Sequence, residues 1–298
     1  MRIYLAYLSI VLLWATTPLA IKWSVKDFSF LFSVTLRMAI GLTCILVILA
    51  LSRQRLPWHS KARQTYLAVS VQIYASMLVI YWAAQFIPSG WISVIFGLLP
   101  LMTALLGAIW LRENNLTLGK LLAYTLGIGG LWTLFGSALQ MGYEAALGII
   151  GALTSTLLHA ASSIWIKRIN AEVPALAQVS GGLLLSMPLY LATWAIVDGQ
   201  WPSEIPLLAL ASTVYLGVIA TTLGFILYYY LLLHQSANKV ALVTLASPVI
   251  ALFLGHAVNQ EPLTLKIATG TALIIGALMV HAFFDWLKQK KQVTTQRK

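Results

Sequence analysis

Acidic side chains are scarce in this sequence: its 298 residues include eight Asp and Glu, 19 Lys and Arg, and only 9% charged residues in total. Average soluble domains have roughly 25% charged and about 45–50% apolar residues, whereas 60% of this chain is apolar. An ordinary soluble fold would have too few charged side chains to cover so much apolar surface. The composition therefore predicts an integral membrane protein.

The sequence also lacks the motifs of most catalytic and metal sites. Its single cysteine, Cys44, lies in an apolar run, so the chain cannot form an internal disulfide, a cysteine-based zinc site or a CxxC motif. It contains no nucleotide-binding glycine loop, no HExxH and no pair of aspartates within an apolar run. These absences argue against an ATP-driven pump and an intramembrane protease. We expect no enzyme activity, no cofactor and no bound metal.

Long polar segments are missing as well, and apolar runs take their place. A membrane-spanning helix needs roughly 20 mainly apolar residues, and only helices or closed barrels satisfy their backbone groups in lipid. Barrel strands need only ~10 residues of alternating polarity, whereas these runs are longer and apolar on all sides. The sequence predicts an all-α membrane protein of ten transmembrane helices, over 3–21, 29–51, 66–86, 91–111, 117–135, 145–166, 176–197, 207–233, 240–258 and 265–284.

The basic residues predict the orientation of these helices. The net charge is +11, which in a soluble chain would raise nucleic-acid binding, but here the Lys and Arg residues lie in short gaps between apolar runs. Cytoplasmic loops of membrane proteins are enriched in Lys and Arg. With the N-terminus inside, all but four of the 19 are cytoplasmic; Lys22, Lys26 and Lys266 are outside and Arg37 lies within a span. We expect a multi-pass protein of the bacterial inner membrane with both termini in the cytoplasm and no nucleic-acid partner.

The two halves of the chain resemble each other. At a shift of 148 positions, matching residues recur at equivalent helix ends: Tyr81 with Tyr229, Pro100 with Pro248, Gly107 with Gly255, and Glu113 with Glu261. A repeat of five spans is odd-numbered, so the second copy must be inserted upside down. We therefore expect two inverted five-helix repeats, 1–142 and 143–298, an architecture in which transporters place a central site where the halves meet.

Prolines and small residues mark candidate moving and packing surfaces. Pro100 and Pro248 each remove one helix hydrogen bond inside a span, so they are candidates for matching bends that serve gating, or are simple kinks without motion. Small residues four positions apart, such as Gly119, Ala123 and Gly127, let helices approach closely in lipid. Such ridges can pack within one chain or between two, so a monomer and a homodimer both stay open.

Polar groups inside spans are costly and mark candidate sites. Arg37 is the strongest candidate, because no acidic residue lies one turn away. It could bind a substrate carboxylate with two parallel hydrogen bonds, or it could be a structural arginine that extends toward the interface. His159, near the middle of its span, could titrate or bind substrate; an interhelical hydrogen bond is the alternative.

An aromatic surface provides a second set of candidates. Tyr74, Tyr81 and Gln85 recur at helical spacing on the third span, and Trp14 lies on the first. Aromatic rings with a few polar tips suit a pocket for a small solute and can also hold a cation. Packing or an interfacial aromatic belt is the alternative. The predicted substrate-binding set is Trp14, Arg37, Tyr74, Tyr81, Gln85 and His159.

These landmarks resemble a known family. The helix ending Pro100…Gly107…Leu111-Arg112-Glu113…Leu116-Thr117, its echo Pro248…Gly255…Glu261…Leu263-Thr264, and Trp14, Lys22 and Arg37 are similar to EamA-type members of the drug/metabolite transporter superfamily. The resemblance covers residues 3 to 284. It implies an inner-membrane carrier, often an exporter of amino acids or other metabolites, and it does not imply a particular substrate.

The sequence thus favours a secondary transporter that exports or exchanges small metabolites such as amino acids by alternating access. A multidrug or lipid exporter is the first alternative. The predicted aromatic surface fits such an exporter. All eight acidic residues fall in loops or at span ends, however, which disfavours a drug/proton antiporter with a carboxylate deep in the membrane. An intramembrane lipid-modifying enzyme is the second alternative, and it would need clustered catalytic groups that the sequence does not contain.

Overall fold

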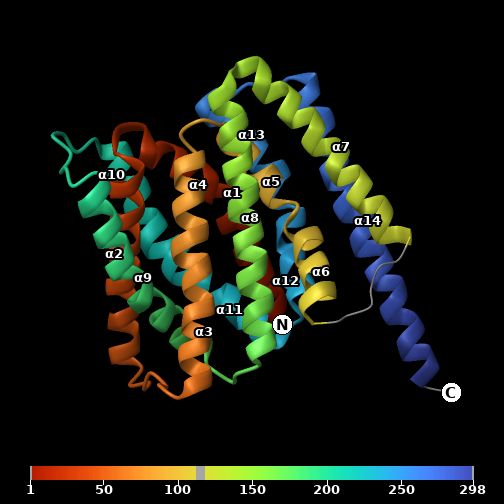
Figure 1. Ribbon diagram of the computed structural model, residues 1–298, viewed down its shortest axis with the longest axis horizontal. Coiled ribbons are helices and arrows are strands. Elements are labelled where there is room, and N and C mark those ends of the chain that lie inside the picture. Colours follow the sequence, from red (N-terminus) through yellow and green to blue (C-terminus); the bar gives the residue numbers. More distant parts are fainter. Residues whose placement is uncertain (1, 112–117, 297–298) are drawn as a thin grey trace.

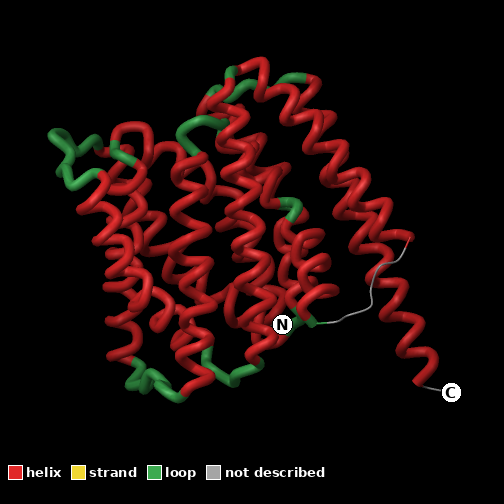
Figure 2. The backbone as a smooth tube through the Cα atoms, viewed as in Figure 1, coloured by secondary structure: helices red, strands yellow, loops and turns green. Residues whose placement is uncertain are grey.

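The part of the chain that the structure describes is a bundle of ten long apolar helices, each long enough to cross a membrane. A computed structural model describes residues 2–111 and 118–296, and these residues contain helices and no strand. Figure 1 shows the helices roughly side by side, with both termini near the same end of the bundle. The short loops gather at the two ends (Figure 2). The predicted all-α class and the number of spans are confirmed.

The spans are built from these elements in chain order. The first five are α1 (Arg2–Asp27); α2 (Phe30–Leu51); α3 (Ser60–Ser70), η1 (Val71–Ser76) and α4 (Met77–Ala83); α5 (Ser89–Phe96) and α6 (Leu99–Trp110); and α7 (Leu118–Met141). The second five are α8 (Tyr143–Ile169); α9 (Ala175–Val197); α10 (Leu207–Tyr215), η2 (Leu216–Leu223) and α11 (Gly224–His234); α12 (Ala237–Ala241), η3 (Leu242–Leu245) and α13 (Ser247–Asn259); and α14 (Leu265–Gln296).

Side chains at the loop boundaries explain where several helices begin and end. The Ser29 hydroxyl accepts a hydrogen bond from the Phe32 backbone N–H, which caps α2. The His59 ring accepts one from the Ala62 backbone N–H at the start of α3. Helix α8 ends at Asn170, whose φ of 48° is the left-handed conformation that commonly ends helices.

Four spans are interrupted, and the interruptions occur in matching pairs. The third span contains the π-helical segment η1 and the eighth contains η2; moved by 148 positions, η1 overlaps η2. The fourth span breaks after Phe96 and the ninth at Ala246. Pro100 and Pro248 lie in the first turns of α6 and α13, where proline fits because those N–H groups have no helical partner. They begin new helical segments rather than bend continuous helices. The pairing agrees with a repeat of the two halves, whereas their inverted orientation and a gating role for the prolines stay predictions.

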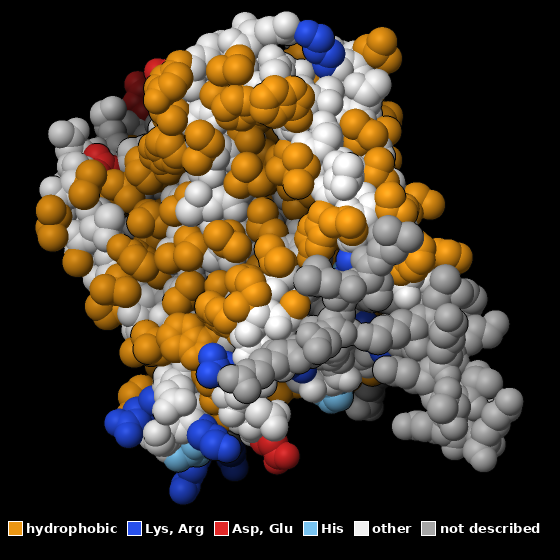
Figure 3. All heavy atoms as spheres, turned by 45° about the vertical axis from the view of Figure 1, so that its right-hand side comes forward, with side chains coloured by type: hydrophobic (Ala, Val, Ile, Leu, Met, Phe, Trp, Pro, Cys, Tyr) orange, Lys and Arg blue, Asp and Glu red, His pale blue; other side chains and the backbone are white. Residues whose placement is uncertain are grey.

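The outer surface is suited to lipid. Large apolar side chains are exposed along the flanks, among them Leu5, Leu8 and Leu12 on α1, and Figure 3 shows an apolar flank with basic side chains gathered at its lower end. Helices α7 and α14 pack against each other at one side of the bundle (Figure 1). They touch through Gly130 and Gly270. A Cβ added at Gly130 would lie 2.7 Å from the Gly270 carbonyl oxygen, and a Cβ added at Gly270 would lie 3.1 Å from the Gly130 carbonyl oxygen.

Candidate functional site

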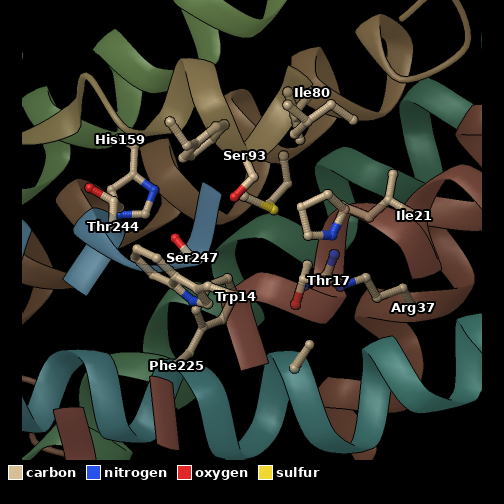
Figure 4. Close-up of a pocket in the computed structure, with 15 residues that line it drawn as sticks. Trp14, Thr17, Ile21, Arg37, Ile80, Ser93, His159, Phe225, Thr244 and Ser247 are labelled. Atoms are coloured by element: carbon tan, nitrogen blue, oxygen red, sulfur yellow. The ribbon is translucent and has the colours of Figure 1, made fainter. Parts of the chain in front are cut away.

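A small cavity of about 70 Å³ lies inside the bundle, and both halves of the chain line it. Its aromatic walls are Trp14, Phe96 and Phe225. The polar side chains face it from several spans, as Figure 4 shows: Thr17, Arg37, Ser93, His159, Thr244 and Ser247. A mainly apolar lining with a few converging polar groups is typical of a small-molecule site, and such sites usually have a larger volume, of about 300–1,000 Å³.

Arg37 provides the only formal charge among the described lining residues. Its side chain comes from α2, is 2% exposed and points toward the cavity (Figure 4). Its Nε donates to Thr221 Oγ1 at 2.8 Å, and its Nη1 donates to Tyr81 Oη at 3.2 Å, with the Tyr81 ring centre 5.7 Å from the guanidinium carbon. These partners are neutral. A buried charge without a counter-charge is costly, and an anion bound in the cavity would offset that cost.

Two glycines bring Arg37 to Thr221. A Cβ at Gly41, one turn after Arg37 on α2, would lie 2.5 Å from the Thr221 side chain. A Cβ at Gly217, on η2, would lie 2.7 Å from Ile40 and 3.0 Å from the Arg37 carbonyl oxygen. Because neither glycine carries a side chain, the second and eighth spans approach closely, which fixes the guanidinium at the boundary between the halves.

His159 is buried at another wall of the cavity. Its side chain is 2% exposed, and neither ring nitrogen has a hydrogen-bond partner among the described residues. Three aromatic rings meet the imidazole edge-on, with ring centres 5.6 Å away for Trp14, 5.9 Å for Phe96 and 5.1 Å for Tyr228. Buried polar groups are nearly always hydrogen-bonded. The open nitrogens therefore fit a solute or water in the cavity.

The structure brings together three of the six predicted residues and places a fourth beside them. Trp14, Arg37 and His159 line the cavity, and Tyr81 is buried behind Arg37. Tyr74 lies elsewhere. Its hydroxyl is 2.6 Å from Thr193 Oγ1.

Gln85 also lies away from the cavity, exposed after the end of α4, with its amide bonded to the Trp82 carbonyl. The π-helical segment η1 contains Tyr74 and adds a residue to its turn, so Tyr74 and Tyr81 do not share the face that a regular helix would give them. A binding role for each of the six residues stays a prediction.

Sequence reasoning missed Thr221, the direct partner of Arg37, and the cavity ring of Phe96. Thr221 does not stand out in the sequence, because a threonine in a span usually donates its hydroxyl to a carbonyl of its own helix and needs no partner elsewhere. The signal that could have found it is the pair Gly41 and Gly217, which permits close packing only once the two helices are known to be neighbours.

A wider hollow of about 500 Å³ opens at the end of the bundle where both termini lie. The ends of α8 and α11, the loop before α12 and α12 itself line it, together with Leu111. Its charged lining residues among those described are Lys167 and Lys239, with His234 beside them. We name this hollow the basic vestibule.

Comparison with known proteins identifies the class of this bundle. The family model of EamA-like transporters matches the chain over residues 1–136 and 146–283. The chain belongs to the EamA-like transporter family. Membership makes it a multi-pass membrane transporter of small-molecule substrates rather than an enzyme.

Individual relatives agree with the family. An uncharacterized transporter of Archaeoglobus fulgidus is 28% identical over 89% of this chain and 93% of its own. A probable amino-acid metabolite efflux pump of Escherichia coli is 27% identical over 73% of this chain and 76% of its own. A crystal structure superposes with a TM-score of 0.69 at 19% identity and covers 95% of this chain and 98% of that one. That likeness shows the fold.

In this EamA-like transporter, polar contacts join several spans at the end of the bundle opposite the termini, where a hollow of about 450 Å³ also opens. Lys22 Nζ donates to the carbonyl oxygens of Ala84 and Gln85 at 2.8 and 3.1 Å, which caps the end of the third span. The Trp23 indole N–H donates to Asn259 Oδ1 at 3.2 Å and so joins the first span to the ninth. The hydrogen bonds of Glu261 add a further link to the fourth span.

Proposed function

We propose that this chain is a secondary transporter that exports or exchanges small metabolites, with amino acids and their derivatives first, by alternating access. The observation that carries the proposal is the uncompensated guanidinium of Arg37 in a cavity shared by both halves. A carboxylate would supply the missing negative charge and accept parallel hydrogen bonds from the guanidinium. The aromatic walls would hold the side chain of the solute.

Contacts between helices of the two proposed halves at one end of the bundle support alternating access. The basic vestibule opens at the end with the termini, and hydrogen bonds between Trp23 and Asn259, and between Glu261 and the start of α5, join helices at the other end. Those contacts join the proposed halves 1–142 and 143–298. We propose that this is the state open to the cytoplasm, with the termini on that side of a bacterial inner membrane.

The name of the Escherichia coli relative, a probable amino-acid metabolite efflux pump, favours the same substrate class. A multidrug exporter of organic cations is less well supported, because the only described charge on the cavity wall is positive. Two like charges brought together in a low-dielectric site repel each other strongly.

The test uses purified protein in liposomes loaded with labelled amino acids, whose release is followed with and without a pH gradient. We expect saturable, selective release that depends on the protein, and the effect of the gradient reports proton coupling. Arg37→Gln should reduce this release at least tenfold while the protein still inserts and elutes as the wild type does, because loss of a buried charge-assisted pair costs roughly 1.5–3 kcal/mol.

Two outcomes would count against the proposal. If no amino acid or derivative is released above the level of protein-free liposomes, the substrate class is wrong. If Arg37→Gln and Tyr81→Ala both transport normally, the cavity is not the substrate site. Arg63→Gln is the matched control, since Arg63 is exposed at the end of the bundle with the termini and does not line the cavity.

A further inference from the structure

Both hollows along the proposed path carry positive charge. Among the described residues, Arg37 is the charged member of the cavity wall, and Lys167 and Lys239 are the charged members of the basic vestibule. We infer that this carrier selects net-negative carboxylates, meaning organic acids without a protonated amine, over zwitterionic and cationic analogues of the same shape. The inference rests on the proposed function, because it takes the two hollows as the path of the solute. Within that substrate class it ranks the derivatives that lack the amine above the amino acids themselves.

The first step of the argument is the cavity itself. Arg37 has only neutral partners, the hydroxyls of Thr221 and Tyr81 and the Tyr81 ring. It is fixed in place by hydrogen bonds on Nε and Nη1, so the guanidinium needs little reorganisation to receive an anion. A carboxylate bound there gains a charge-assisted pair in surroundings that screen it weakly.

The second step concerns an amine on the same solute. An α-ammonium group lies next to its carboxylate, so binding at Arg37 would place it in the same cavity. The described wall offers hydroxyl oxygens: those of Thr17 and Thr244 donate to the backbone carbonyls of Leu13 and Ala241, which leaves their lone pairs free. Such oxygens accept hydrogen bonds but carry no charge, and a buried ammonium without a counter-charge is costly.

The neutral groups of the wall suit a hydroxyl, a keto group or an amide. Either open nitrogen of His159 can donate or accept according to its tautomer. The face of the Trp14 ring could attract a cation, but the positive charge of Arg37 lines the same cavity and would repel that cation. The balance favours a solute whose second polar group is uncharged.

The third step is the entrance. Lys167 and Lys239 lie on different spans and face one vestibule, which Leu111 also lines. A cleft lined by charges of one sign concentrates solutes of the opposite sign and raises their rate of entry. The vestibule therefore favours anions before they reach the cavity, and this preference should weaken with salt, because the Debye length falls to about 3 Å at 1 M.

The experiment compares three phenyl compounds of nearly equal shape in proteoliposomes of the wild-type protein. Phenyllactate is an anion, phenylalanine is a zwitterion, and phenylalaninamide is a cation at neutral pH. Initial protein-dependent rates are measured for each over a range of concentrations, with leucine and its 2-hydroxy acid as a second pair. We expect the hydroxy acids to have at least a tenfold higher kcat/KM than the amino acids and the amide to be the poorest substrate.

Three variants locate the cause of the preference. Arg37→Gln should remove most of the advantage of phenyllactate over phenylalanine. The double change of Lys167 and Lys239 to Gln should lower the rate for phenyllactate about threefold at low salt and little at high salt, since its effect is electrostatic entry. Lys61→Gln is the matched control, because Lys61 is a basic residue near the same end of the bundle that lines neither hollow.

The outcomes separate the two proposals. Equal or better transport of phenylalanine or its amide would overturn the anion preference and leave the transporter function intact. An unchanged preference in Arg37→Gln would also overturn it, because the charge would then not be its source. No protein-dependent movement of any of the five compounds would overturn the anion preference together with the proposed function.

Discussion

The Glu261 carboxylate, at the end of the ninth span, accepts a hydrogen bond from the Ser89 backbone N–H at 2.9 Å, at the start of the fourth. It also accepts from the Gly90 N–H at 3.1 Å and from the Asn259 side chain at 2.9 Å. A carboxylate at a helix N-terminus is favoured by the helix dipole and by the free N–H groups there. Glu261 thus caps α5 from the other half of the chain, and it is only 9% exposed.

We expect Glu261→Ala to lower the free energy of unfolding by about 1–3 kcal/mol, because it leaves buried N–H groups without a partner. The measurement is thermal unfolding in detergent. Glu204→Ala is the control, since Glu204 is exposed in the loop before α10. Equal unfolding temperatures for the two variants would show that the Glu261 cap contributes little to stability.

Tyr81→Phe should reduce transport without preventing insertion. The substitution removes the hydroxyl that accepts from Arg37 Nη1, and a net hydrogen bond of about 0.5–1.5 kcal/mol corresponds to a roughly two- to tenfold loss in kcat/KM. Tyr74→Phe is matched chemically but removes a hydroxyl bonded to Thr193, away from the cavity. We expect it to transport normally. A larger loss in Tyr74→Phe than in Tyr81→Phe would contradict this assignment.

His159→Phe separates binding from stability. The imidazole has two buried nitrogens without partners among the described residues, so an apolar ring of similar shape removes a desolvation cost and should not lower the unfolding temperature. Transport should fall about fivefold or more, as expected for the loss of one hydrogen bond of about 1 kcal/mol to the solute. Unchanged transport would mean that the histidine only packs against Trp14 and its neighbours.

Gly130→Ala should destabilise the pairing of α7 with α14. The new Cβ would lie 2.7 Å from the Gly270 carbonyl oxygen, which is backbone and cannot rotate away. Overpacking of this kind costs typically 1–3 kcal/mol. Gly136→Ala on the same helix meets no atom within 4 Å, so it should stabilise the helix slightly, by about 0.5–1 kcal/mol. Thermal unfolding of both variants tests the prediction: the unfolding temperature should fall in Gly130→Ala and rise slightly in Gly136→Ala.

The sequence predicted part of the candidate site for definite reasons. Burying Arg37 or His159 inside a span costs free energy, so both were expected in a cavity between helices rather than in lipid. Trp14 was predicted as a lining residue from its place on the first span. Tyr74 and Gln85 were chosen from regular helical spacing. The π-helical turn at Val71–Ser76 changes that spacing, and Gln85 lies beyond the end of α4.

The sequence by itself determined the ten spans and the class of protein, because transfer of a helix into lipid depends on the composition of some twenty consecutive residues. Only the tertiary structure decided that Thr221 meets Arg37, that Glu261 caps the fourth span, and that Trp14 and Phe96 enclose His159. Those contacts join residues far apart in the chain. They depend on helix phase and on close approach at glycines, which no local pattern records.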